Sequence, residues 1–303
     1  MKEAILKTNQ LTKKYDNFTA LENVNIQINK GDIYGLIGRN GAGKTTLMKV
    51  ITTLTNKTSG EYELFGEKEN VLEKKKRIGC LIENPAFFPN LTAYENLKYY
   101  CFQKGIADKN VIDEVLELVD LKEAKNKKFK NFSLGMKQRL GIAFAILDSP
   151  DFIILDEPIN GLDPIGISKL RDTFKKLNTE KNITIMISSH ILSELYMVAN
   201  RFCIIEKGNV IKELTKEELD TECSKCIVIK TDDTKKASVV LETNLKTTNY
   251  KIINTSEIRL YDYLDHTEKV SKELISHDIT IMGLHETGIT LEEYFKTVIK
   301  EEL

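Results

Sequence analysis

A glycine-rich loop near residue 40 carries the first residues suited to chemistry. The chain matches the pattern G-x-x-x-x-G-K-[ST] at every fixed position from Gly38 to Thr45. Glycines let backbone N–H groups close around a phosphate, and the lysine supplies a mobile cation for the terminal phosphates of a nucleotide. The threonine is placed to hold Mg²⁺. The loop residues expected to bind the nucleotide are Gly38, Asn40, Gly41, Ala42, Gly43, Lys44, Thr45 and Thr46.

Two adjacent acids form the second reactive group. Asp156 and Glu157 follow four apolar residues, Phe152–Leu155, which predicts a buried strand ending in two carboxylates. Asp156 would orient Mg²⁺ through its water shell, and Glu157 would polarise an attacking water as general base. Alone, such a pair could also be a strand-end acid that caps the next helix. The phosphate loop upstream favours the catalytic interpretation.

Short strands and helices must position these groups. The apolar run Ile33–Gly38 predicts a buried strand leading into the loop, and a helix is expected to begin near Lys44. Core strands are also predicted at Ile78–Ile82 and Ile183–Ser189, whereas residues from about 84 to 150 have a helical pattern. Strands alternating with helices imply an α/β fold with a mainly parallel sheet. The helical segment should form an inserted subdomain beside it. Further strands are expected at Ala4–Lys7, Val24–Ile28 and Glu61–Phe65.

The composition changes beyond about residue 215, where glycine becomes rare and Thr, Lys and Glu increase. The pattern predicts the order β-α-β-β-α-β, from a strand at Cys226–Lys230 to a strand at Ile279–Leu284, and then a helix at Leu291–Ile299. This is the ferredoxin-like arrangement. We therefore expect a nucleotide-binding domain over residues 1–215 and a small α+β accessory domain over residues 216–303.

Charge and hydropathy exclude several classes of protein. The 303 residues include 44 Lys+Arg and 45 Asp+Glu, and the net charge of -1 argues against a nucleic-acid binder. No apolar run approaches the roughly 20 residues that a membrane helix requires. The N-terminus lacks an apolar signal core, so a cytoplasmic protein that reaches the membrane through a partner is expected. The five scattered cysteines are typical of reduced thiols, including the lone CxxC at Cys223–Cys226.

The order of these motifs resembles that of ABC transporter ATPase subunits over about residues 1–215. The resemblance depends most on a Ser-x-Gly-x-Lys-Gln-Arg element, Ser133–Arg139, shortly before the acidic pair. In that family the signature helix caps the γ-phosphate of ATP bound on the opposite subunit. Ser133 and Gly135 are therefore expected to contact ATP across a dimer. Leu134 and Met136 replace the usual glycine and glutamine but leave the backbone donors in place.

The resemblance implies three more site residues. Tyr15 matches the aromatic residue that stacks on adenine in the family. Asp163, in Asn160–Pro164, matches the D-loop residue that crosses the dimer interface, and His190 matches the switch histidine that contacts the γ-phosphate. Tyr15 could also be an ordinary exposed strand tyrosine.

Glu83 departs from the family pattern. The family has glutamine after this core strand, whereas the chain reads Ile82-Glu83-Asn84-Pro85. A carboxylate there would bind Mg²⁺ more strongly and add negative charge near the γ-phosphate, so Glu83 joins Thr45 and Asp156 as a predicted metal ligand. This glutamate, with the C-terminal run Leu291–Phe295, resembles the ATPases of lantibiotic-immunity and bacitracin-type exporters.

The resemblance implies the ATP-hydrolysing subunit of a bacterial exporter. Such a subunit works as a homodimer, or paired with a related ATPase, on a membrane permease at the cytoplasmic face. Phe87 and Phe88 lie where the family grips a cytoplasmic helix of the permease. The alternative is a soluble ABC-type ATPase acting on the ribosome or on DNA, but the chain has neither the two cassettes nor the long coiled coil of those classes. A guanine-specific Asn-Lys-x-Asp motif is also missing.

Overall fold

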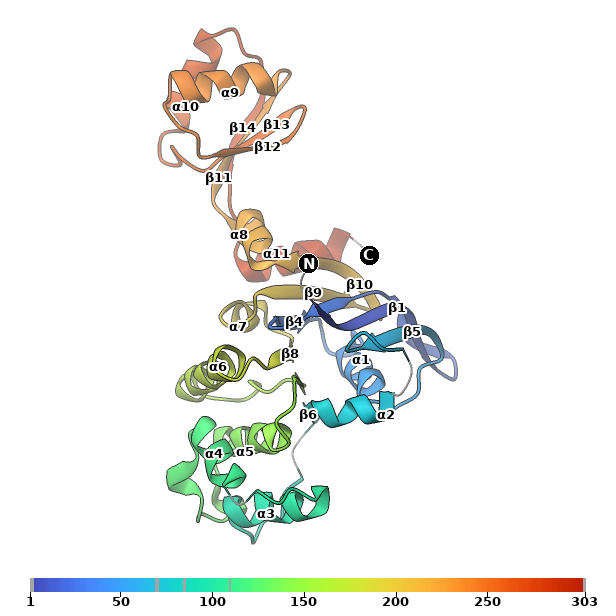
Figure 1. The fold of residues 1–303 in the computed structure, drawn as a ribbon. Helices are drawn as coiled ribbons and strands as arrows, with labels where there is room; N and C mark the ends of the chain where they lie inside the picture. Colours follow the sequence, from blue (N-terminus) through green and yellow to red (C-terminus); the bar gives the residue numbers. More distant parts are fainter. Residues whose placement is uncertain (1–2, 69–70, 84–85, 109, 302–303) are drawn as a thin grey trace. The chain divides into compact units, whose positions relative to one another are not determined.

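The computed structural model describes residues 3–68, 71–83, 86–108 and 110–301. The chain divides into two compact units (Figure 1). The first consists of Met1–Lys216 with Val298–Leu303, and the second of Glu217–Thr297. Each has its own apolar core.

A six-stranded sheet is the centre of the first unit. Its strands are β4 (Ile33–Ile37), β6 (Ile78–Leu81), β7 (Phe152–Leu155), β8 (Thr184–Ser189), β9 (Arg201–Glu206) and β10 (Asn209–Thr215). They pair in the order β10-β9-β4-β8-β7-β6, and all neighbours are parallel except β10 and β9. Strands β4, β7 and β8 are buried along their whole length, as expected for a sheet covered on both faces. Their carboxyl ends meet at one edge, where both predicted motifs follow.

A second, antiparallel sheet contains β1 (Ala4–Tyr15), β2 (Phe18–Val24), β3 (Gln27–Asn29) and β5 (Ser59–Leu64). The strand predicted at Ala4–Lys7 extends to Tyr15, because register shifts let β1 pair with β3 at its start and with β2 at its end. Helix α1 (Lys44–Ile51) packs its apolar face into a core that it shares with both sheets. This packing anchors the glycine-rich loop at the start of α1.

Helices inserted between β6 and β7 form the predicted subdomain, as the ribbon shows (Figure 1). They are α3 (Ala93–Lys104), α4 (Val111–Leu118) and α5 (Leu134–Ile146). A capping box of Thr92 and Glu95 starts α3. Helix α5 also contacts β6 closely, because a Cβ on Gly79 would lie 1.9 Å from the carbonyl oxygen of Ala145. The helical pattern was predicted to begin near residue 84, but Asn84 and Pro85 lie outside the described residues.

The remaining helices of the first unit are α2 (Val71–Lys74), α6 (Pro164–Thr179) and α7 (Leu192–Tyr196), with 3₁₀ turns at Lys75–Arg77, Lys122–Ala124 and Phe129–Asn131. No helix among the described residues is both long enough and apolar enough to cross a bilayer.

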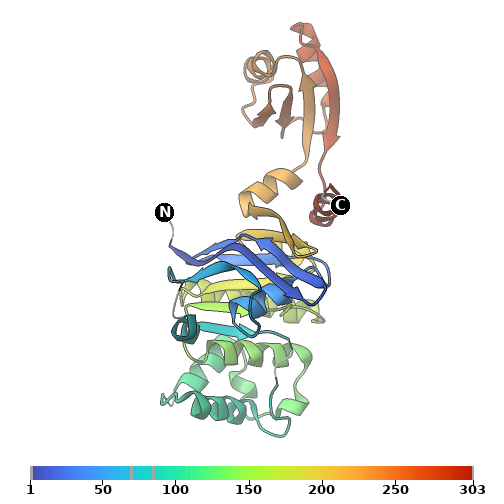
Figure 2. The same cartoon turned by 90° about the vertical axis from the view of Figure 1, so that its right-hand side faces the viewer.

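The second unit has the element order β-α-β-β-α-β (Figure 2). After α8 (Lys216–Cys223) come β11 (Cys226–Thr231), α9 (Thr234–Thr243), β12 (Tyr250–Asn254), β13 (Glu257–Leu260), α10 (Thr267–Ser276), β14 (Ile281–Thr287) and α11 (Leu291–Glu301). The sheet order is β12-β13-β11-β14 with every pair antiparallel, a split βαβ topology. Strand β14 begins two residues later than predicted, since Ile279 instead packs into the core beneath the helices.

Candidate nucleotide-binding site

The glycine-rich loop joins β4 to α1 in a shape that only glycines allow. A Cβ on Gly38 would lie 2.4 Å from the carbonyl oxygen of Ile205. Gly43 has a φ of 110°, and its Cβ would lie 2.7 Å from the carbonyl oxygen of Ala20. The loop therefore passes close to neighbouring backbone. It leads into the N-terminus of α1, and the first N–H groups of a helix have no intrahelical partner and suit a phosphate.

Lys44 is folded back over this loop. Its Nζ donates hydrogen bonds to the carbonyl oxygens of Gly38, at 2.7 Å, and Arg39, at 3.2 Å. The same Nζ lies 3.1 Å from Oε1 of Glu157, and the lysine side chain is 5% exposed. A cation this buried needs an anionic or hydrogen-bonding partner, and here it has both kinds. A bound phosphate would be a further anionic partner.

Glu157 links the loop to the predicted switch histidine. Its Oε2 lies 3.0 Å from Nδ1 of His190, while Oε1 contacts Lys44. The residue has a φ of 46°, a left-handed conformation that is strained for a side chain of this size. Its backbone N–H donates to Oγ of Ser188 at 2.8 Å, which holds the strained turn. The structure thus brings Lys44, Glu157 and His190 into one hydrogen-bonded group.

Asp156 is held by two hydroxyl groups. Thr45 donates from Oγ1 to Oδ2 of Asp156 at 2.7 Å, and Ser188 donates from Oγ to Oδ1 at 2.6 Å. Hydroxyl and carboxylate oxygens suit Mg²⁺, so Thr45 and Asp156 fit the predicted role. No three His, Cys, Asp or Glu side chains among the described residues are grouped to hold a metal. An ion here would complete its shell with Thr45, water and phosphate oxygens.

Ser188 is a site residue that the sequence motifs do not identify. It ends β8 beside β7 and touches both acids at once, accepting from the Glu157 N–H and donating to Asp156. The sequence signal was its position in Ser188-Ser189-His190, at the end of a buried strand. The next serine accepts a hydrogen bond from the Ile191 N–H at 3.0 Å and so shapes the turn that carries His190.

Glu83 does not contact the Asp156 hydroxyl cluster in this structure. It follows β6 with a φ of 66°, and its Oε1 lies 2.6 Å from Nζ of Lys49 on α1. This hydrogen bond is the main reason that the pKa of Lys49 is raised, and the negative charges of Glu83 and Asp156 raise it further. Tyr15 is 42% exposed at the end of β1, and its ring is covered by Lys13 with Nζ at 4.4 Å from the centroid.

The signature and D-loop residues are exposed helix caps. Ser133 caps α5 by accepting from the Met136 N–H at 3.3 Å, and Asp163 caps α6 by accepting from the Gly166 N–H at 3.1 Å. Within the described residues, neither makes a hydrogen bond or ion pair to the Lys44–Glu157–His190 group. The two elements do meet each other, since a Cβ on Gly161 would lie 3.1 Å from Cδ2 of Leu134.

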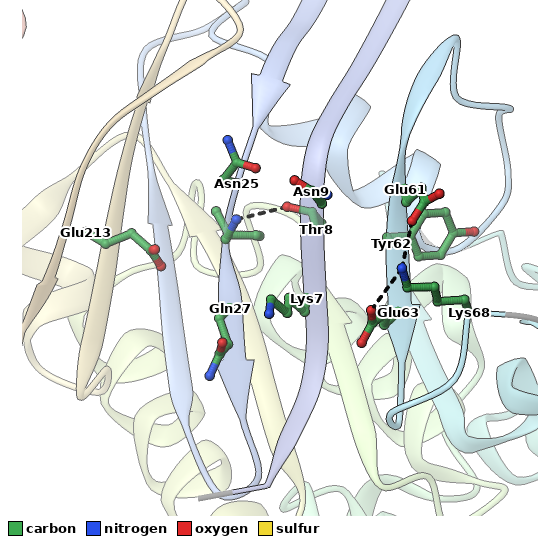
Figure 3. Close-up of a pocket in the computed structure, with 11 residues that line it drawn as sticks. Lys7, Thr8, Asn9, Asn25, Gln27, Glu61, Tyr62, Glu63, Lys68 and Glu213 are labelled. Carbon is green, nitrogen blue, oxygen red and sulfur yellow. Dashed lines mark hydrogen bonds and ion pairs between the residues drawn. The ribbon is translucent and has the colours of Figure 1, made fainter. Parts of the chain in front are cut away.

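Several hollows lie outside this group, and two of them are close to segments discussed above. An apolar one of about 230 Å³ lies where β6 meets the helical subdomain, and it is lined by Leu54, Cys80, Leu81, Ile82, Ala86, Phe87, Tyr100 and Phe144. Phe87 is 8% exposed and packs on Phe129 at 5.1 Å, so its main role is structural, whereas Phe88 is 45% exposed. A second hollow of about 480 Å³ lies on the antiparallel sheet, where Lys68 pairs with Glu61 and Glu63 (Figure 3). No predicted nucleotide-binding residue lines it.

Comparison with known proteins identifies the family. The profile of the ABC transporter family matches residues 21–160. The bacitracin transport ATP-binding protein BcrA of Enterococcus faecalis is 40% identical over 98% of this chain and 97% of its own length. The lantibiotic transport ATP-binding protein SrtF of Streptococcus pyogenes is 46% identical over 69% of this chain and 90% of its own.

Solved structures agree with the sequence relatives. The ATP-binding cassette MJ0796, in a dimeric post-hydrolysis state with ADP and Pi, superposes with a TM-score of 0.63 at 27% identity, over 70% of this chain and 98% of its own. These matches confirm the fold class and the family resemblance predicted from the motifs. The chain therefore belongs to the ATP-binding proteins of ABC transporters, and it is an ABC ATPase.

Proposed function

We propose that this chain drives a bacterial exporter that gives immunity or resistance to antimicrobial peptides of the bacitracin or lantibiotic class. It would act at the cytoplasmic face of the membrane with a separate permease. The class of cargo is inferred from the similarity to BcrA, which extends over 98% of the chain and therefore includes the second unit. The likeness to SrtF covers 69% of the chain, which favours the bacitracin type.

Hydrolysis would begin by an exchange of partners at Lys44. In the structure its Nζ is bound to two carbonyl oxygens and to Glu157. Phosphate oxygens are stronger anionic partners, so nucleotide binding would draw Lys44 away from Glu157. Oε1 of Glu157 would then be free to orient the attacking water and accept its proton, while His190 keeps hold of Oε2.

The other site residues support this step. Thr45 and Asp156 would hold Mg²⁺ beside the phosphates, and the ion supplies charge neutralisation there. Ser188 keeps both acids oriented through its two hydrogen bonds. Tyr15 would stack on the adenine.

A second ATPase subunit would complete the nucleotide site. Ser133 and Asp163 are the exposed caps of α5 and α6, and the half-buried Gly135 lies in the first turn of α5, where a facing subunit can reach them. The start of α5 points backbone N–H groups outward, an arrangement suited to the γ-phosphate on that subunit. The dimer would be a homodimer or a pair with a related ATPase.

The helical subdomain offers a place for the permease. Phe88 and Tyr99 are both about half exposed, and their rings contact each other at 5.0 Å. The apolar hollow of about 230 Å³ lies where the subdomain meets β6, and Phe87 and Tyr100, the sequence neighbours of these two rings, help to line it. Exposed aromatic rings with an apolar hollow suit the apolar face of a short partner helix.

Glu157→Gln tests the ATPase role and the permease partner together. Glutamine cannot accept the proton, so turnover should fall about 10²- to 10⁴-fold while MgATP binding persists. The trapped nucleotide should make the chain dimeric in size-exclusion chromatography. Tagged protein with MgATP should then retain a multi-spanning protein from detergent-solubilised native membranes.

Glu180→Gln is the matched control, because Glu180 is an exposed glutamate at the end of α6. It should hydrolyse ATP normally. Normal turnover in Glu157→Gln would remove Glu157 as the base, and capture of ribosomes or DNA-bound proteins would favour the soluble ATPase alternative. Co-expression of the native chain with the captured permease should raise survival in bacitracin, and the Glu157→Gln form should not.

A further inference from the structure

Glu83 has a cationic partner that the sequence does not predict. Lys49 lies on α1, five residues after Lys44, and Glu83 follows the end of β6. The Nζ of Lys49 and the Oε1 of Glu83 are 2.6 Å apart. The partner therefore comes from the helix that also carries the phosphate-binding lysine and Thr45.

Lys49 is a second cation among the carboxylates at this edge of the sheet. Glu83 follows β6, and Asp156 and Glu157 follow the adjacent parallel strand β7. Of these three carboxylates, Lys44 pairs with that of Glu157. The hydrogen bonds of Asp156 within the described residues are to hydroxyl and backbone groups. Lys49 supplies the second cation and pairs with Glu83, so the extra negative charge of Glu83 is offset locally.

The exposure of the pair suits a contact that opens. The side chains of Lys49 and Glu83 are 34% and 66% exposed. Water screens an ion pair of this kind, so the contact stabilises little and exchanges easily. Divalent Mg²⁺ attracts a carboxylate more strongly than one ammonium group does, and a carboxylate is among its preferred ligands.

We propose that Lys49 is a positioning residue for Glu83. It holds the Glu83 carboxylate while the site is empty and competes with Mg²⁺ for it when MgATP binds. A glutamine at position 83 would have no charge for Lys49 to hold. The inference rests on the proposed role of Glu83 as a Mg²⁺ ligand.

The test is a double-mutant cycle read by Mg²⁺ binding. All chains carry Glu157→Gln to suppress hydrolysis, and MgCl₂ is titrated against a fixed amount of fluorescent N-methylanthraniloyl-ATP. Lys49→Met removes the competitor, so the Mg²⁺ midpoint should fall about two- to fivefold when Glu83 is present. The same substitution should shift the midpoint less than about 1.5-fold in the Glu83→Gln background.

Two controls separate the pairing from general charge loss. Lys49→Arg keeps the cation and should keep the midpoint. Lys68→Met breaks a similarly exposed ion pair, Lys68 with Glu61 at 2.9 Å, and should leave the midpoint unchanged.

The outcomes distinguish the pairing from the role of Glu83 itself. Equal shifts for Lys49→Met in both backgrounds, or no shift in either, would overturn the pairing alone. A Glu83→Gln chain with an unchanged Mg²⁺ midpoint would overturn the Glu83 ligand role, and the pairing with it.

Discussion

His190 and Lys44 approach the Glu157 carboxylate from two sides, each on its own oxygen. In the proposed mechanism the His190 contact with Glu157 persists and the Lys44 contact breaks, so the two residues have different roles. Lys44 serves the nucleotide, whereas His190 fixes the orientation of the base. A base held only by the strained backbone of residue 157 would be free to rotate.

His190→Ala should therefore slow hydrolysis more than it weakens binding. A misplacement of the base by about 1 Å can cost about 10²-fold in rate, so the turnover number should fall by about 10- to 100-fold. The affinity for MgATP should change less than threefold or so, because Lys44 and the loop remain. Steady-state kinetics and equilibrium nucleotide binding measure the two effects separately.

His266→Ala is the matched control for this variant, since the His266 side chain is 66% exposed in the second unit. It should change neither quantity. A larger loss in affinity than in turnover for His190→Ala would contradict the orienting role and place the histidine among the nucleotide ligands.

The motifs of the site were predictable from sequence where they are local. The loop from Gly38 to Thr45 and the acids after β7 are contiguous patterns, because a tight turn and a strand end are built from neighbouring residues. Ser188 and the Lys49–Glu83 pair were not predictable, since each contact joins residues more than 30 positions apart. Only the pairing of strands and the packing of α1 bring such residues together.

Between elements, Asp120 joins the signature helix α5 to the D-loop helix α6. Its Oδ2 accepts from Arg139 on α5 at 3.1 Å and from Lys169 on α6 at 2.7 Å. Asp120 itself follows α4, so three helices meet at one carboxylate. The two elements expected at the dimer interface are thereby tied together within one chain.

Asp120→Asn should loosen this junction in a pH-dependent way. The hydrogen bond from Lys169 is the main cause that lowers the pKa of Asp120 below its ordinary value of 3.8. A lowered carboxyl pKa stabilises the folded state above about pH 5, and that stability is lost as the pH falls through the folded pKa. The side chain is 62% exposed, so the difference at pH 7 should be about 1 kcal/mol or less.

Urea unfolding of the native chain and Asp120→Asn measures this difference at pH 7 and again near pH 3. Asp172→Asn, on the exposed face of α6, is the control and should match the native chain at both values. If Asp120→Asn is less stable to urea than the native chain by the same amount at pH 7 and near pH 3, the ionised carboxylate is not the cause of the difference.

Element boundaries were less predictable than element order. The pattern anticipated β-α-β-β-α-β beyond residue 215, and the strands and helices follow that order. It placed the first strand at Ala4–Lys7, whereas β1 continues to Tyr15 through register shifts against its partners. It began the last strand at Ile279, an apolar residue that packs under α10 instead. In both cases tertiary packing decides the boundary.

At the scale of the whole chain, each of the two units has an apolar core of its own. One core lies between the two sheets and α1, and it includes the helix that starts the nucleotide loop. The other lies between the β12-β13-β11-β14 sheet and helices α9 and α10. The proposed nucleotide-binding residues all belong to the first unit, so nucleotide binding should act on its stability directly.

Differential scanning calorimetry of the Glu157→Gln chain should therefore resolve two unfolding transitions, because separate cores need not unfold together. MgATP at about 100 times its dissociation constant should stabilise the first unit by about 2.7 kcal/mol and raise its transition alone. Leu274→Ala assigns the other transition, since Leu274 is fully buried in the second core. This substitution should lower the free energy of unfolding of the second unit by about 2 to 5 kcal/mol. The temperature of the MgATP-sensitive transition should not change. A single transition that moves as a whole with both MgATP and Leu274→Ala would instead show that the two units unfold as one cooperative body.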